Sequence, residues 1–396
     1  MQHPVHWEGS IRAKTEQGFC GRFENLQEID AKEAFMEAKR RRQPRKLALL
    51  LIGILLGGVV SAQQSSLVIG LLLPGPKNDA GYNQSFYDAV MQVQRNVPGV
   101  RVIVAEYVTD AEAESTMETM IRQGAKLIFP CAFAFQYPAL AVAARNPSVY
   151  FMHPGGWEVK PNFSNFFATT QLHFYIMGVA AGLMTKTNQI GFVAGMPLGY
   201  TLGNVNGFHL GARSVNPKVT TRLLFTFSWG DTTKEAAAAQ ALLNQGCDVI
   251  TMHLDSPVAV IQTVEAAGAY TIGFMSPEAR KYAPKGWITG LAFNWGDYFT
   301  ESAKAVMNGT WRTGFIRRGL SEGFLQIAPF GSAVPESVRQ KVLAVAEDYK
   351  AGRIDPFKGP IKDQKGVVRI PAGVVWGNEK MGDFDWLVEG IIGEPK

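Results

Sequence analysis

The chain has 396 residues, of which 46% are hydrophobic and 18% are charged, and its formal net charge is +5. This composition excludes an intrinsically disordered chain and is enough for two or three domains. Much of the positive excess lies in the run KRRRQPRK at 39–46, and residues 63–396 are close to neutral. The charge therefore does not indicate a nucleic-acid partner, and we expect none.

The basic run continues into a short apolar segment. Residues 47–62 read LALLLIGILLGGVVSA, and a basic region, an apolar run and small residues at its end form the pattern of a secretory signal. The run is shorter than the about 20 apolar residues that cross a membrane. We expect a signal peptide at 36–62 that is cleaved before Gln63, which makes the protein periplasmic; an uncleaved anchor is the alternative. Met36 is then the true start, and residues 1–35 are expected to be an over-long gene call and disordered.

The rest of the chain contains an internal repeat with an offset of 121 or 122 residues. The matching runs are VIGLLLPGP (68–76) with QIGFVAGMP (189–197), RQGAKLIF (122–129) with NQGCDVIT (244–251), and SVYFMHPGG (148–156) with AYTIGFMSP (269–277). Each run is short and rich in Val, Ile, Leu and Phe, which is typical of strands buried in a parallel sheet. Helical patterns separate the runs, and those before the second pair end in Gly124 and Gly246, which are helix-stop signals.

Strands and helices that alternate in this way predict βαβ units. We therefore expect an α/β fold of two similar Rossmann-like lobes in tandem, each with a parallel sheet. Such sheets bind ligands beyond the carboxyl ends of their strands, where the loops of this chain are rich in aromatic residues, Asn, Asp and His. Two lobes that face each other form a cleft that can close by a hinge.

These loops supply the candidate ligand-binding residues, which are Tyr82, Asn83, Phe133, Phe135, His153, Trp229, Asp255 and Trp295. The aromatic members offer flat surfaces for stacking, and the polar members offer hydrogen bonds to ligand N–H groups and ring nitrogens. Alternatives stay open for several of them. Tyr82 faces either the cleft or the core, Asn83 and Asp79 either contact the ligand or cap the first helix, and Asp255 either binds the ligand or caps the next helix.

The sequence lacks the short motifs of several other site classes. It has no GxGxxG or GxxxxGK[ST] for nucleotide phosphates, no GxSxG nucleophile elbow, no HExxH and no CxxC. His153 and His253 stand at strand ends that we take as equivalent, from which both could line the cleft, but two His alone make a weak metal site. We expect no metal, no cofactor and no catalytic residue. Cys131 and Cys247 lie in apolar stretches and are expected to be two buried free thiols.

Several stretches together resemble the basic membrane protein (BMP) family. They are GYNQSFYDAV, FAFQYPALAVAARNPSVYF, MGVAAGLMTKTNQIGFVAG, GFHLGARSVNPKV, DSPVAVIQTVEAAG and PFGSAVPESV, within residues 67–360. Family members are substrate-binding proteins of ABC importers for purines and nucleosides. The resemblance implies a type I periplasmic-binding-protein fold, with three crossovers between the lobes and a cleft that closes on one purine. We place lobe I at 67–172 plus about 292–325, and lobe II at 173–291 plus about 326–380.

Two positions depart from the nucleoside-binding members of that family. Those members typically carry an Asp at a strand end that grips the ribose hydroxyls, where this chain has Met275, and a Lys in the next crossover, where it has Asn294 or Trp295. The loss of both favours a free base, and the SW-D and NWG motifs resemble the adenine-binding branch. We expect a monomeric, non-catalytic receptor that binds adenine or a similar purine and delivers it to an ABC permease in the inner membrane.

Three alternatives stay open. The first is a nucleoside-binding member of the same family. The second is a secreted enzyme that acts on a nucleoside or sugar, with Asp79 or Asp255 as acid or base. The third is a ligand sensor for a receptor kinase. The sequence does not separate adenine from guanine, hypoxanthine or a small amide.

Overall fold

The computed structural model describes residues 66–380 and 382–396, which belong to one compact unit. The predicted signal peptide at 36–62 and residues 1–35 lie outside the described residues. In the described part, no helix is both long enough and apolar enough to span a membrane. The fold is built around two large sheets.

The first sheet holds six parallel strands in the order β11-β5-β4-β3-β1-β2. Its strands are β1 (Leu67–Leu72), β2 (Val100–Ala105), β3 (Ala125–Pro130), β4 (Tyr150–Pro154), β5 (Phe163–Ala168) and β11 (Phe315–Arg318). Its helices are α1 (Tyr82–Asn96), α2 (Ala113–Arg122), α3 (Gln136–Arg145) and α8 (Gly296–Met307), with the 3₁₀ helix η1 (Phe133–Phe135). Leu71 and Leu72 are buried in different core clusters, so both faces of this sheet are covered.

The second sheet holds seven strands in the order β12-β10-β9-β8-β6-β7-β15, and all neighbours are parallel except β12 beside β10. Its strands are β6 (Gln189–Ala194), β7 (Thr220–Phe225), β8 (Val249–His253), β9 (Tyr270–Met275), β10 (Trp287–Phe293), β12 (Leu325–Ile327) and β15 (Ile391–Ile392). Its helices are α4 (Thr170–Met184), α5 (Gly199–Val215), α6 (Thr232–Asn244), α7 (Val258–Ala266), α9 (Glu336–Lys350) and the 3₁₀ helix η2 (Pro277–Tyr282). Phe192 and Val193 again belong to different core clusters.

The two sheets confirm the predicted repeat. The order β2-β1-β3-β4-β5 in the first sheet is the order β7-β6-β8-β9-β10 in the second, and the three matching sequence runs fall on β1 and β6, β3 and β8, and β4 and β9. The predicted helix stops Gly124 and Gly246 have φ angles of 96° and 86°, a left-handed conformation that glycine adopts without a Cβ clash.

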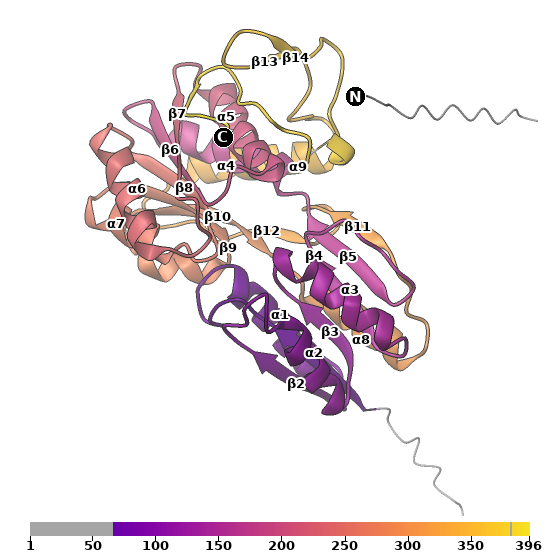
Figure 1. Cartoon of the computed structure of the whole chain (residues 1–396). Coiled ribbons are helices and arrows are strands. Elements are labelled where there is room, and N and C mark those ends of the chain that lie inside the picture. Colours follow the sequence, from indigo (N-terminus) through magenta and orange to yellow (C-terminus); the bar gives the residue numbers. More distant parts are fainter. Residues whose placement is uncertain (1–65, 381) are drawn as a thin grey trace, which may run out of the picture. The chain divides into compact units, whose positions relative to one another are not determined.

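The chain passes between the two sheets three times within the described residues (Figure 1). After β5 of the first sheet it enters α4, which packs on α5; after β10 of the second sheet it enters α8, which packs on α1; and β11 of the first sheet leads to β12 of the second. The residue limits of lobe I (67–172 plus about 292–325) and lobe II (173–291 plus about 326–380) stay predictions.

The C-terminal residues dock on the second sheet, a feature that the sequence analysis did not predict. They form the hairpin β13 (Ile361–Lys362) and β14 (Val368–Ile370), the 3₁₀ helix η3 (Asn378–Lys380) and β15, which pairs with β7. The Nδ2 atom of Asn206 in α5 donates to the Trp386 carbonyl at 2.9 Å, and its Oδ1 accepts from the Val388 N–H at 2.9 Å. Figure 1 shows this segment in yellow beside α5.

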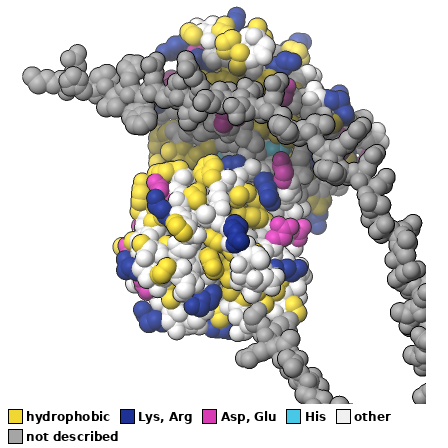
Figure 2. Space-filling view, turned by 90° about the vertical axis from the view of Figure 1, so that its right-hand side faces the viewer, with side chains coloured by type: hydrophobic (Ala, Val, Ile, Leu, Met, Phe, Trp, Pro, Cys, Tyr) yellow, Lys and Arg dark blue, Asp and Glu magenta, His cyan; other side chains and the backbone are white. Residues whose placement is uncertain are grey.

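The described surface carries charges of both signs, and the two cysteines lie in the interior. In the view of Figure 2, Lys and Arg side chains are interspersed with Asp and Glu side chains over the described surface. Cys131 and Cys247 are 0% and 3% exposed and are free thiols, which confirms the prediction for both.

Candidate functional site

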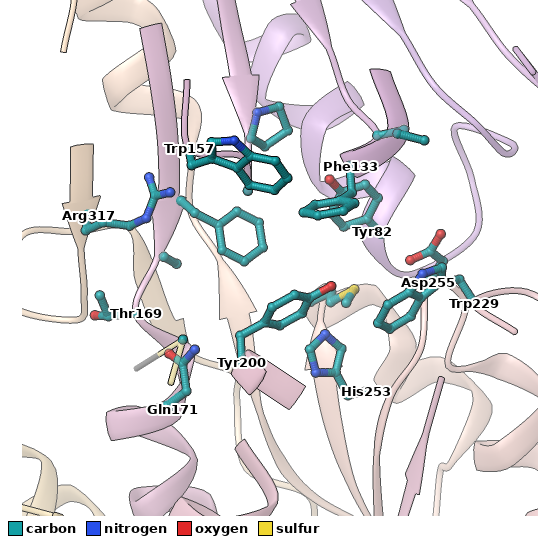
Figure 3. Close-up of a pocket in the computed structure, with 18 of the residues that line it drawn as sticks. Tyr82, Phe133, Trp157, Thr169, Gln171, Tyr200, Trp229, His253, Asp255 and Arg317 are labelled. Carbon is teal, nitrogen blue, oxygen red and sulfur yellow. The ribbon is translucent and has the colours of Figure 1, made fainter. Parts of the chain in front are cut away.

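A cavity of about 740 Å³ lies at the carboxyl ends of the strands of both sheets. Figure 3 shows how side chains from the two sheets face it. The residues that line it are Pro74, Tyr82, Asp110, Ala132, Phe133, Ala134, Pro154, Gly155, Trp157, Phe167, Ala168, Thr169, Gln171, Tyr200, Trp229, His253, Asp255, Met275, Phe315, Arg317, Asn378, Glu379, Gly382 and Asp383. This is the position where open α/β sheets bind ligands, and the volume is in the range of small-molecule sites.

Aromatic side chains form the two walls of the cavity. From the first sheet, Phe133 and Trp157 lie with their ring centroids 5.7 Å apart and are 45% and 53% exposed, so each ring keeps a free surface. From the second sheet, Tyr200 and Trp229 lie nearly parallel, with an interplanar angle of 9° and centroids 6.4 Å apart. The indole of Trp229 rests directly on Gly195, where a Cβ atom would collide with the ring.

A buried polar network fixes the loop that carries Trp157. The Oε1 atom of Gln136 accepts from the backbone N–H groups of Trp157 at 2.8 Å and Glu158 at 3.2 Å. Arg317 donates from Nη2 to the Gly156 carbonyl at 2.7 Å. Side chains from α3 and β11 therefore hold the backbone of this loop in place, which fixes the point from which the Trp157 side chain extends.

Asp255 places a carboxylate on the cavity wall where the two sheets meet. Its backbone carbonyl accepts from the Tyr82 N–H at 2.8 Å, and the neighbouring Ser256 hydroxyl donates to the Asp79 carbonyl at 3.1 Å. Burial raises the pKa of Asp255 to about 8, and the nearby charges of Asp79 and Glu235 act in the same direction. No described residue hydrogen-bonds to the Asp255 carboxylate, which leaves both oxygens available to a ligand.

Polar groups also lie at the far end of the cavity. Figure 3 shows Arg317 and Thr169 on the side opposite Asp255 and Trp229. The Arg317 guanidinium lies 3.8 Å from the centre of the Phe315 ring and donates to the Asn165 side-chain oxygen at 2.8 Å. Burial lowers its pKa to about 10, and among the described residues no carboxylate forms an ion pair with it.

The structure brings four of the predicted site residues to the cavity: Tyr82, Phe133, Trp229 and Asp255. The Tyr82 side chain, whose orientation the sequence left open, lines the cavity at the start of α1 and packs edge-on against Phe86.

Two predicted residues lie in the protein interior instead. Asn83 is 2% exposed; its Nδ2 donates to Asp79 at 2.8 Å and its Oδ1 accepts from the Gly75 N–H at 3.3 Å. The Asp79 carboxylate accepts from backbone N–H groups of the first turn of α1, so the capping alternative describes this pair. Phe135 is 0% exposed in a core cluster, because the single turn of η1 directs Phe133 and Phe135 to opposite sides.

The predictions for His153 and Trp295 need the same correction. His153 is 0% exposed, and its Nε2 lies 2.9 Å from the Ala132 carbonyl, so it supports the Phe133 loop from behind. His153 lies one residue before the end of β4 whereas His253 ends β8, and these strands do not correspond in the repeat. Trp295 is 1% exposed and stacks on Phe293 with centroids 4.6 Å apart, which makes it part of the aromatic core behind the cavity.

Most of the residues that line the cavity are absent from the predicted set, among them Trp157, Tyr200, His253 and Arg317. Trp157 follows β4, Tyr200 lies in the first turn of α5 and His253 ends β8, so all three lie at or after the carboxyl ends of strands, and this position was the available signal. Arg317 reaches the cavity from β11, and four C-terminal residues reach it as well, namely Asn378, Glu379, Gly382 and Asp383; no local pattern marks any of them.

Comparison with known proteins identifies the family. Residues 66–354 match the Bmp family, described as ABC transporter substrate-binding protein PnrA-like. The chain belongs to this family. A purine-binding protein of Brucella abortus is 34% identical over 341 residues, which cover 86% of this chain and 96% of that protein.

Two further comparisons show what the chain is similar to in sequence and in fold. A putative glucose-binding protein of an ABC transporter from Haloferax volcanii is 27% identical over 281 residues, 71% of each chain. A solved solute-binding protein of an ABC transporter from Conexibacter woesei has a TM-score of 0.63 at 21% identity, and the match covers 73% of this chain and 98% of that one. The predicted α/β fold of the type I periplasmic-binding-protein class is thereby confirmed. Substrate-binding proteins of ABC transporters bind small molecules and deliver them to a permease.

Proposed function

We propose that this member of the Bmp family binds a purine base, such as adenine, in the cavity and delivers it to an ABC permease without catalysing a reaction. The observation that carries the proposal is the pair of aromatic walls, Phe133 with Trp157 and Tyr200 with Trp229, at the strand ends of two different sheets. A flat heteroaromatic ring stacks between such walls, and each aromatic pair contributes about 0.5–1.5 kcal/mol beyond area burial.

The polar residues supply the selectivity that stacking lacks. Asp255 accepts a hydrogen bond from a ring N–H or an exocyclic amino group of the base, through its carboxylate or, below its pKa of about 8, through the carbonyl oxygen of the protonated acid. A ligand that leaves such a buried group unpaired loses about 1–3 kcal/mol. The purine-binding name of the relative from Brucella abortus supports the same ligand class. We further propose that the protein acts in the periplasm, as the predicted signal peptide indicates.

Calorimetry with adenine, hypoxanthine, adenosine and inosine tests the ligand. We expect the free base to bind at least about tenfold tighter than its nucleoside, because the Asp and Lys that grip ribose in nucleoside-binding relatives are replaced by Met275 and the Asn294–Trp295 segment. One buried polar group of the ribose without a hydrogen-bond partner would account for this tenfold difference in affinity, since it costs about 1–3 kcal/mol and tenfold corresponds to about 1.4 kcal/mol. Nucleosides that bind as tightly as the bases would contradict the choice of ligand.

Mass spectrometry of the small molecules that co-purify with the protein tests the ligand class independently. A purine that is recovered chemically unchanged after incubation agrees with a transport receptor. A product that appears only when the protein is present would favour the enzyme alternative instead.

A purine nucleoside is the second candidate, because the cavity extends past the aromatic walls. The Arg317 and Thr169 side chains lie on the side of the cavity opposite Asp255 and Trp229, where they offer hydrogen bonds to a second part of a ligand. In the calorimetric series, this candidate predicts that adenosine or inosine binds more tightly than the base and that Arg317→Gln removes the difference.

A further inference from the structure

His253 ends β8, and its imidazole lies on the wall of the cavity. The ring packs against Tyr200, Trp229 and Phe274, with centroid distances of 5.6, 5.5 and 5.0 Å. Figure 3 shows it next to Tyr200 at the edge of the open space. Because three rings hold the imidazole, its two nitrogens have fixed and different surroundings.

The first nitrogen has a protein partner. The Nδ2 atom of Asn204 lies 2.8 Å from Nδ1 of His253, and Oδ1 of Asn204 accepts from the Thr170 hydroxyl at 2.8 Å. All three residues are at most 4% exposed. In this orientation of the Asn204 amide, its N–H group faces Nδ1 and donates to it, which makes Nδ1 the unprotonated acceptor. A neutral imidazole with this arrangement carries its proton on Nε2.

The second nitrogen has no partner among the described residues, although the residue lines the cavity. Burial lowers the pKa of His253 to about 3, so the ring stays neutral at physiological pH. The Nε2–H group is therefore a fixed neutral donor. The atom is not one of the fully buried unpaired atoms of the described residues, so it is open to the cavity, where an acceptor atom of a ligand can pair with it.

We propose that the Nε2–H group of His253 donates to an acceptor atom on the edge of the bound ring, and that Asn204 and Thr170 fix this direction. The inference rests on the proposed function and narrows its ligand class. The favoured ligand is a heteroaromatic base whose edge offers an acceptor to His253 and an N–H donor to Asp255. An aminopurine has this pattern, since a ring nitrogen lies beside its amino group.

Analogues that lack one acceptor test the hydrogen bond. In 1-deaza-, 3-deaza- and 7-deazaadenine a single ring nitrogen is replaced by C–H. We expect one of the three to bind about 10- to 100-fold more weakly than adenine, since a buried donor is left unpaired. In His253→Phe this difference should fall to about threefold or less, whereas His253→Gln, which keeps an N–H donor, should retain part of it. Equal losses in the wild type and in His253→Phe would overturn the proposal.

The tautomer is measured on the ligand-free protein by ¹⁵N NMR of labelled histidine. We expect protonated Nε2 and unprotonated Nδ1 for His253. Asn204→Asp, whose carboxylate accepts a proton, should move a proton to Nδ1. Asn96→Asp, which places a carboxylate on the exposed end of α1, is the control and should leave the signal unchanged. A wild-type ring with the proton on Nδ1 would overturn the assignment.

The two experiments separate the inference from the proposed function. If no purine binds, the proposed function fails and the ligand class fails with it, while the NMR result still decides whether His253 presents a donor. If His253→Phe does not fold, the wild-type preference among the deaza analogues and the tautomer still test the proposal. If adenine binds and all three analogues bind equally well, the hydrogen bond is absent.

Discussion

Two carboxylates without hydrogen-bond partners among the described residues, those of Glu235 and Asp255, lower the stability of the folded protein. Glu235 in α6 is 0% exposed, and neither carboxylate oxygen has a hydrogen-bond partner in the described structure. Burial raises its pKa to about 7, and the pKa of Asp255 rises to about 8. Unpaired carboxylates are rarely buried in proteins. Because Asp255 lines the cavity, we infer that this destabilising carboxylate is kept in the protein because it recognises the ligand.

The pH dependence of stability tests this cost at Asp255. Its pKa of about 8 in the folded state lies above the ordinary 3.8, so protonation favours folding. This contribution is fully present below about pH 4 and is lost as the pH rises through 8. Asp255→Asn cannot ionise. The free energy of unfolding of this variant should therefore exceed that of the wild type by a margin that grows between pH 4 and 8, by about 1.4 kcal/mol for each pH unit over which only the folded wild type keeps the proton.

Thermal unfolding of the ligand-free protein at several pH values measures the margin. Asp110→Asn, which changes an exposed carboxylate on the same cavity, is the matched control and should show no such trend. The same Asp255→Asn variant should bind the base more weakly. A margin that does not change with pH would contradict the assignment of a buried charge penalty to Asp255.

The position of the Trp229 ring offers a second test at this scale. Trp229→Ala should weaken base binding about tenfold or more through lost stacking and burial. Gly195→Ala should also weaken it, because the added Cβ collides with the indole and displaces it. Gly230→Ala is the control, since a Cβ there meets nothing within 4 Å. Calorimetry that gave equal affinities for Gly195→Ala and Gly230→Ala would show that the ring position does not matter.

At the scale of elements, the sequence predicted the strands and helices of the internal repeat but missed the strand β15, which pairs with a strand that is distant in the sequence. Apolar runs and terminal glycines identified the strands and helices of both βαβ sets, because buried parallel strands and helix ends have local signatures. The two-residue strand β15 has no periodic signal, and it pairs Ile391 with Thr221 across a long stretch of chain. The sequence also could not predict which of two phenylalanines faces the cavity. Phe133 and Phe135 are the same residue type, and only the turn of η1 between them makes one exposed and the other buried.

The C-terminal extension provides the test for a whole element. Residues 355–396 lie beyond the family match, yet they contribute β15 and bury Phe357, Phe384 and Trp386. A chain that ends at Ile354 should unfold several degrees lower, because it loses three large buried side chains and exposes the edge of β7. Differential scanning calorimetry measures the shift, and a chain that lacks only 394–396 is the control. An unchanged melting temperature would contradict the packing role of the extension.

At the scale of the whole molecule, three chain crossings connect two sheets that both supply the cavity walls. A ligand between Phe133 and Trp229 contacts both sides at once. The free energy of these contacts is gained only when both walls approach the ring, so binding favours a closed arrangement. The Tyr82 N–H donates to the Asp255 carbonyl at 2.8 Å and so joins the two sides, whereas the crossing from β5 to α4 lies at Thr169 on the opposite side of the cavity.

Small-angle X-ray scattering tests this closure. Saturation with the tightest-binding base should reduce the radius of gyration, because the two walls move together around the ring. Trp229→Ala, measured at a base concentration that saturates only the wild type, should keep the ligand-free radius and thereby exclude an unspecific effect of the added compound. An unchanged radius for the saturated wild type would mean that the base occupies a rigid pocket. The aromatic residues of the second wall would then contribute little, so the affinity lost in Trp229→Ala should also be small, which makes the two measurements a joint test of the cleft.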